Sequence, residues 1–235
     1  MKLLYIFVSV LFCNICLSQI NNITKVTYKI NSSKPQNATS RFKPDDLEFE
    51  LIFNNDTSLY KIVDKMESDM DPNYKVVSII HGGNLIYYTD FNKKENLFNV
   101  NFLNQTYNIN LQYDKYDWQI LNESKTINGF KCYKATTTIE KLDKGKNTVI
   151  KKHPIVWFTS EIPTRFGPKG LNGLPGLILE GSIDGVYTFY ATKITNSNTK
   201  EKLIKPDAEI EMNERDFDDL MFNNYKINKE ASKPE

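Results

Sequence analysis

The sequence predicts an all-β protein with a mainly antiparallel sheet, either a single strongly curved sheet or a half-open barrel. Three observations favour this fold class. Apolar and polar residues alternate with a period of two along residues 24–30, as in a half-buried strand. Runs of β-forming residues come in pairs that flank short turns. No amphipathic helical stripe of ten residues interrupts these runs before the C-terminal segment.

The strands are expected to be joined by turns rich in Asn, Asp and Gly. The runs at 47–53 and 57–63 flank the Asn-Asn-Asp sequence at 54–56, which is typical of a hairpin. The Asn-Gly pair at 128–129 and the Asp-Gly pair at 184–185 are further hairpin turns, because these residues adopt the positive φ that tight turns require. The expected β segments are 24–30, 47–53, 57–63, 76–80, 85–91, 97–103, 107–113, 118–121, 130–139, 149–159, 177–182 and 186–194.

Two internal segments and the C-terminal tail lack this pattern. Residues 39–46 and 64–74 are polar and contain proline, which predicts loops. From Thr195 the chain is polar and charged, with one short helix expected at about 213–223 and a disordered end from residue 226. Asn213 is the expected cap of that helix.

The N-terminus has the pattern of a secretory signal peptide. Lys2 is followed by an apolar run at 3–17 and by Ser18, so we expect a signal peptide at 1–18. The apolar run is too short for a transmembrane helix, and Phe12 and Ile15, which precede the two cysteines, do not fit a lipidation signal. The domain organisation is then a signal peptide at 1–18, a curved β domain at 19–195 and a polar tail at 196–235. The protein is expected in the periplasm or at the outer-membrane periphery.

The composition of the mature chain excludes an internal disulfide bond and gives no support for binding to nucleic acid or an anionic membrane. Only Cys132 of the three cysteines remains after cleavage, so no internal disulfide can form. The whole chain has 30 basic and 29 acidic residues, and loss of Lys2 makes these numbers equal. This balance favours neither nucleic acid nor an anionic membrane surface as a partner.

Residues 166–179, which we call the glycine run, have a glycine at every third position. A polyproline-II conformation would place all four glycines on one side, and a backbone without Cβ can turn tightly or approach another backbone closely. Three triplets in one chain are too few for a collagen triple helix. The residues expected to form this structural motif are Gly167, Gly170, Gly173, Leu174, Pro175, Gly176, Leu177 and Ile178.

Residues 173–178 read GLPGLI, and this sequence resembles the signature of the GLPGLI family of exported Bacteroidota proteins. The resemblance extends over residues 118–194, with its clearest further matches at 125–136 and 156–163. It implies an exported envelope protein of largely unknown role, with an outer-membrane transporter as a candidate partner. It also implies a β-rich core similar to the curved half-barrels of periplasmic lipoprotein carriers. Family members often carry an aromatic residue within 167–172 that this chain lacks, which leaves its ligand open.

Residues with catalytic or metal-binding potential are few. His81 lies beside a Gly-Gly turn and is expected at the surface, as is His153 before a proline, and Cys132 is expected to be a buried structural thiol. A Cys132–His153 nucleophile pair is the alternative. We predict no catalytic residue, metal site or cofactor, because no nucleophile elbow, phosphate-binding loop or zinc pattern is present. The acidic clusters at 69–71 and 216–219 are expected to be solvated.

Two classes of function follow. The first is an exported binding or assembly protein, for which the candidate ligand- or partner-binding residues are Trp157, Pro163, Arg165, Phe166, Leu171 and Leu174. In this hypothesis an apolar ligand or an envelope protein binds beside the glycine run. The leucines of the run are equally well explained as core residues. The second class is a secreted hydrolase that uses carboxylates the sequence does not identify.

Overall fold

The computed structural model describes residues 22–32, 47–63, 72–198 and 202–232. The expected signal peptide, the expected loop at 39–46 and the acidic pair at Asp69 and Asp71 lie outside these ranges. Among the described residues, no helix is long and apolar enough to cross a membrane.

The fold is all-β and mainly antiparallel, as the sequence predicts. One twelve-stranded sheet has the order β14-β6-β5-β4-β3-β2-β1-β13-β12-β11-β8-β7, and β9 and β10 form a separate two-stranded hairpin. The sheet strands are β1 (Asn22–Ser32), β2 (Glu48–Phe53), β3 (Thr57–Ile62), β4 (Leu85–Asp90), β5 (Glu95–Phe102), β6 (Gln105–Asn110), β7 (Gln119–Ile127), β8 (Phe130–Thr136), β11 (Ile155–Thr159), β12 (Leu177–Ser182), β13 (Tyr187–Asn198) and β14 (Ile210–Asn213). The hairpin strands are β9 (Ile139–Asp143) and β10 (Thr148–Lys152), and the helices are α2 (Pro72–Ile80), the 3₁₀ turn η4 (Pro168–Gly170) and α3 (Glu214–Ala231).

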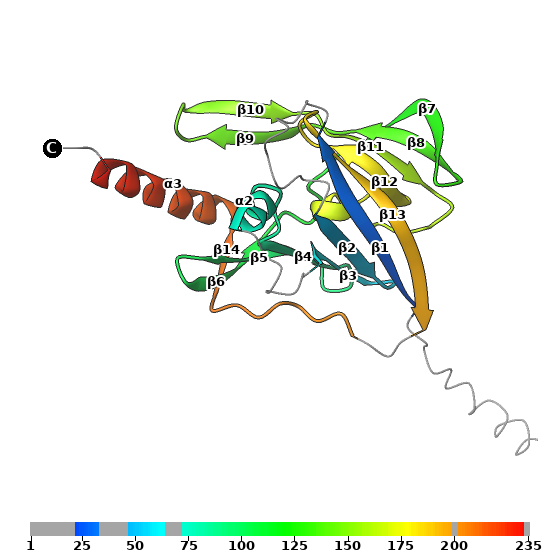
Figure 1. Ribbon diagram of the computed structural model, residues 1–235, viewed down its shortest axis with the longest axis horizontal. Helices are drawn as coiled ribbons and strands as arrows, with labels where there is room; N and C mark the ends of the chain where they lie inside the picture. Colours follow the sequence, from blue (N-terminus) through cyan, green and yellow to red (C-terminus); the bar gives the residue numbers. More distant parts are fainter. Residues whose placement is uncertain (1–21, 33–46, 64–71, 199–201, 233–235) are drawn as a thin grey trace, which may run out of the picture.

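The sheet is strongly curved and remains open, since β14 and β7 are its two edges. In Figure 1 the strands β7, β8 and β11 lie above the strands β2 to β6, with β1, β13 and β12 connecting the two halves. A single buried cluster contains Tyr28 of β1, Phe49 of β2, Cys132 of β8 and Val156 of β11. The two halves of the curved sheet therefore share one hydrophobic core.

Three predicted β segments have a different structure. Residues 76–80 form the second half of α2, because Tyr74, Val77 and Ser78, at helical spacing, point inward, while the β-branched Val76 and Ile79 are exposed. This outward set of β-branched side chains is what made the segment look like a strand. The predicted strand at 149–159 is two strands, since Pro154 lacks the N–H that a continuous ladder needs. The predicted strand at 130–139 likewise ends at Thr136.

The C-terminal tail belongs to the same fold. Asn213 caps α3 by accepting a hydrogen bond from the Asp216 amide at 2.9 Å, which confirms the predicted start of the helix. The helix continues to Ala231, so the expected disorder from residue 226 is wrong for residues 226–231. The sequence did not predict β14, which pairs in parallel with β6. Phe217 of α3 is buried in a second small cluster against β5 and β6.

Candidate ligand-binding cavity

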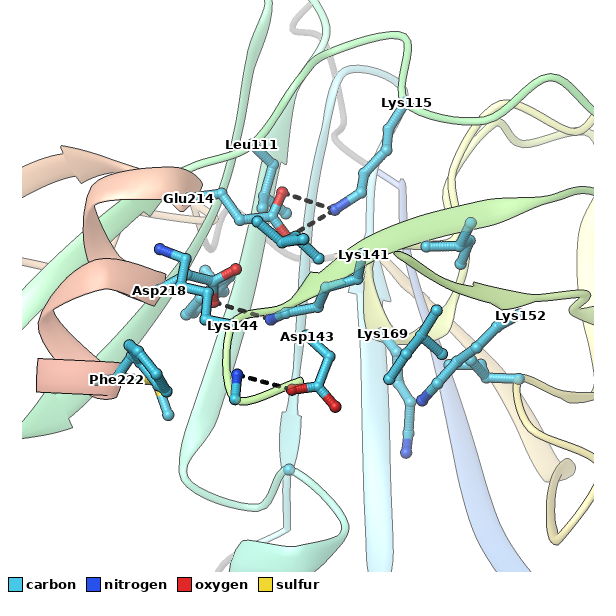
Figure 2. Close-up of a pocket in the computed structure, with 18 of the residues that line it drawn as sticks. Leu111, Lys115, Lys141, Asp143, Lys144, Lys152, Lys169, Glu214, Asp218 and Phe222 are labelled. Carbon is cyan, nitrogen blue, oxygen red and sulfur yellow. Dashed lines mark hydrogen bonds and ion pairs between the residues drawn. The ribbon is translucent and has the colours of Figure 1, made fainter. Parts of the chain in front are cut away.

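A cavity of about 1040 Å³ lies on the inner side of the sheet. Its floor is the face of β3, β4 and β5, and its walls are the end of α2, the hairpin β9–β10 and the helix α3 (Figures 1 and 2). The segments that surround it are far apart in the sequence. The volume is at the upper end of the range for small-molecule sites, which makes it large enough for an extended ligand.

Aromatic side chains form the floor. Tyr60 of β3 is 2% exposed, and its ring stacks on Phe49 with centroids 5.6 Å apart. Tyr87 of β4 contacts Tyr60 edge to face, and Phe98 of β5 contacts Tyr87. Burial, followed by the charge of Glu214, raises the pKa of Tyr87 to about 12, so this hydroxyl remains a neutral hydrogen-bonding group.

Seven lysines and three carboxylates line the cavity. The lysines are Lys115, Lys141, Lys144, Lys146, Lys152, Lys169 and Lys229, and the carboxylates are Asp143, Glu214 and Asp218. Figure 2 shows Lys115 bonded to Glu214 and Lys141 bonded to Asp218, each with an N–O distance of 2.8 Å. Within the described part of the chain, four of the seven lysines have no ion pair, so the interior of the cavity is positively charged.

Lys169 belongs both to the glycine run and to the cavity. Its backbone has φ 56° and ψ 29°, the left-handed conformation that residues with a Cβ rarely adopt. Its Nζ donates a hydrogen bond to the carbonyl oxygen of His81 at 3.2 Å and lies 6.0 Å from the Phe49 ring. Burial lowers the pKa of Lys169 to about 8, although the more distant charge of Asp184 raises it.

Three of the candidate binding residues lie in the core. Phe166, Leu171 and Leu174 are exposed by only 1 to 2%. These side chains therefore do not reach the surface, which agrees with the hypothesis that the leucines of the run are core residues. Asn172 fixes this part of the run, because its side chain accepts a hydrogen bond from the Gly167 amide and donates one to Thr89.

The glycines of the run are required for close packing and for turns. A Cβ on Gly176 would lie 2.1 Å from the carbonyl oxygen of Thr159, and Gly173 has φ +103°. Leu177 then enters β12 directly, as expected. The polyproline-II expectation is wrong, however, because residues 168–170 form the 3₁₀ turn η4.

The other candidate binding residues lie elsewhere. Pro163 and Arg165, with Pro175, line a second pocket of about 650 Å³, where the Arg165 guanidinium packs 4.6 Å from the Phe91 ring centroid. Trp157 lies on β11 with the ammonium group of Lys125 4.4 Å above its ring. The structure thus does not bring the six candidate residues together, and binding by these three remains a prediction.

The histidines and the cysteine do not form a catalytic site. His81 is buried against Tyr187, with ring centroids 4.5 Å apart, so its expected surface position is wrong. Burial and the charge of Lys169 lower the pKa of His81. Cys132 is buried as predicted, and exposed His153 pairs with Thr138. No group of three metal-binding side chains occurs within the ranges that the structure describes.

The sequence gives little indication of the residues that line the cavity. Asp218 was expected to be solvated, but it lines the wall and pairs with Lys141. The one local signal was Lys169, which is the only charged residue among the glycines, prolines and apolar residues of the run. Tyr60 gave no signal, because it looks like any inward residue of an alternating strand.

Comparisons with known proteins identify relatives of this fold. A family model described as N-glycanase peptide, N-terminal domain, matches residues 65–224. Two solved structures of PNGF-II, in space groups C2 and P21, are similar with a TM-score of 0.56 each, at 15% and 16% sequence identity. Each match covers 86% of this chain and 33% of the PNGF-II chain, so this chain spans about a third of that length. At this identity the likeness shows the fold alone. No curated protein matches the chain.

Proposed function

The chain belongs to the family described as N-glycanase peptide, N-terminal domain, and on this premise we propose that it is an exported binding protein whose cavity takes up a saccharide. The observation that carries the proposal is the lining of the cavity, where aromatic rings and lysine ammonium groups lie side by side. Sugar rings present C–H faces that pack on aromatic rings, and their hydroxyl oxygens accept hydrogen bonds from ammonium groups. A volume of about 1040 Å³ suits several sugar units better than one.

The arrangement of the carboxylates favours binding over hydrolysis. Glu214 and Asp218, which are the two α3 carboxylates of the cavity, are each bonded to a lysine. Hydrolysis of a glycoside needs two carboxyl groups that act on the scissile bond, and here both carboxylates are already bonded to lysines. A secreted hydrolase remains the alternative function.

Saccharide binding can be tested on the purified protein by calorimetric titration with oligosaccharides and glycopeptides, with a fatty acid as the apolar comparison. We expect saccharide binding, and about tenfold weaker binding for Tyr225→Ala, because this exposed ring of α3 lines the cavity. Ile227→Ala is the matched control, since Ile227 is exposed on the same helix but does not line the cavity. Binding of the fatty acid alone would contradict the proposal, and a change in the mass of the saccharide would favour the hydrolase.

Export is part of the same proposal, and its support is the N-terminal sequence and the resemblance to the GLPGLI family. Cleavage after Ser18 gives a mature chain that begins at Gln19. Intact-mass measurement of the protein from the cell envelope tests this. A retained Met1, or a lipid on Cys16, would contradict it.

A further inference from the structure

The floor of the cavity contains a buried hydroxyl without a hydrogen-bond partner. Among the described residues, nothing bonds to the Tyr60 hydroxyl, although Tyr60 is 2% exposed and lines the cavity. Its ring is held by stacking on Phe49 and by edge contacts with Tyr28 and Tyr87. A buried polar group is nearly always satisfied in a folded protein, because leaving it unpaired is unfavourable. The hydroxyl therefore suits a partner that enters the cavity.

A lysine ammonium group lies near Phe49, the ring on which Tyr60 stacks. Phe49 stacks on Tyr60 and also has the Nζ of Lys169 6.0 Å from its centroid. Within the described ranges, the carbonyl oxygen of His81 is the one hydrogen-bond acceptor of this ammonium group, and Asp184 acts on it only through its charge, without an ion pair. An ammonium group has three donors, so at least one is available to a ligand.

The backbone at Lys169 positions this side chain by adopting an energetically unfavourable conformation. Lys169 has a left-handed φ of 56°, a position where glycine would be unstrained. Residues in such conformations cluster at ligand-binding sites. Gly170 follows directly and packs on the Tyr87 ring, which ties the turn to the aromatic floor.

The surroundings add to the positive charge. Lys152 and Lys169 both line the cavity, and Figure 2 labels both among its lining residues. Asp184 acts on the two lysines only through its longer-range charge. The positive charge of these two lysines favours an anionic group on the ligand, because electrostatic interactions are stronger in a partly desolvated site.

We propose that Lys169 and Tyr60 form an anion-binding subsite on the floor of the cavity, so that the ligand is an acidic saccharide carrying a carboxylate, sulfate or phosphate group. This inference rests on the proposed saccharide function. The ammonium group supplies the charge, and the tyrosine hydroxyl donates a hydrogen bond to an oxygen of the anionic group.

The test compares one saccharide in charged and neutral form. An oligosaccharide that ends in a hexuronic acid and its methyl ester are titrated into the protein, followed by the sulfated and phosphorylated forms, which distinguish the three anionic groups. We expect wild-type protein to bind one of the acids at least tenfold more tightly than the ester. Lys169→Met should remove this preference, because it weakens binding of the acid far more than binding of the ester, while Tyr60→Phe should reduce the preference severalfold. Lys193→Met is the control, because Lys193 is exposed on β13 and does not line the cavity.

The pH dependence gives an independent readout. Since the pKa of Lys169 is about 8 in the free protein, affinity for the acid should be constant below pH 8 and fall above it, by up to tenfold per pH unit. Affinity for the ester should not change. Thermal unfolding of Lys169→Met should match wild type, which separates loss of binding from loss of folding.

The outcomes separate the two proposals. If the ester binds as tightly as every acid, the anion subsite is wrong and the saccharide function stands. If Lys169→Met weakens acid and ester equally, Lys169 has only a structural role and the subsite is also wrong. If no saccharide binds to the folded wild-type protein, both proposals fail.

Discussion

The glycine run and the wall formed by α3 and the hairpin β9–β10 are held in place by different forces. Leu171 and Leu174 of the run are buried in the main core, and Gly176 lies against the backbone of Thr159. Within the wall, α3 is attached to the hairpin by partly exposed pairs between lysines and carboxylates, such as Lys141–Asp218. Close packing tolerates little change, whereas exposed ion pairs contribute little free energy. The conspicuous motif is thus mainly structural, and the chemistry of the cavity lies on residues that form no motif.

Lys169 connects these two regions. The run positions its backbone in η4, and its side chain reaches the aromatic floor of the cavity. The run therefore contributes one polar group to the candidate site while its apolar residues fill the core. Substitutions of the apolar residues of the run should therefore change the stability of the protein, whereas substitutions of the polar residues of the cavity should change ligand binding.

The largest expected effect is that of a charge at Leu171. This side chain is 1% exposed, so Leu171→Asp places a carboxylate in the core and should reduce the free energy of unfolding by at least about 4 kcal/mol. Leu142→Asp, on the 47% exposed side chain of the hairpin, should cost less than about 1 kcal/mol. Urea denaturation measures both. A stable Leu171→Asp protein would show that Leu171 is accessible and would restore the hypothesis that it binds a ligand.

The next effect concerns two glycines that differ in what surrounds them. Gly176→Ala brings a Cβ to 2.1 Å from a backbone oxygen and should cost about 2 to 4 kcal/mol, because the strand must move. Gly185 has φ +75° and nothing within 4 Å of its Cβ position, so Gly185→Ala should cost about 1 kcal/mol through backbone strain alone. The same denaturation experiment compares them. Equal losses would mean that close packing of the run is not what requires Gly176.

The sequence predicted the fold class because strand alternation and turn chemistry are local signals. Asn128 and Gly129 both have positive φ, which is what the expected hairpin turn requires. The helix start at Asn213 was predicted for the same reason, since a cap and its partner at Asp216 are three residues apart. In contrast, β14 has only four residues, and its pairing with β6 depends on residues about a hundred positions away.

The candidate site could not be predicted, because its parts come together only in the folded chain. Tyr60, Lys169 and Asp218 come from a strand, a loop and the C-terminal helix. Their common environment depends on the curvature of the sheet and on the position of the hairpin, neither of which leaves a local pattern. The residues that the sequence predicts to bind a ligand include apolar residues of the glycine run, which belong to the core.

The smallest expected effect is that of the ion pair between the hairpin and α3. A double-mutant cycle made of Lys141→Met, Asp218→Asn and the double variant isolates the contribution of this ion pair. The coupling free energy between the two side chains should be about 0.2 to 1 kcal/mol. The Lys141 side chain is largely exposed, so raising the salt from 0.1 M to 1 M, which shortens the screening length from about 10 to 3 Å, should remove this coupling. The loss caused by Gly176→Ala should not depend on salt, because it arises from a steric contact. A coupling above about 2 kcal/mol that persists in 1 M salt would mean that the wall is held as firmly as the run. The contrast between the two regions would then be wrong.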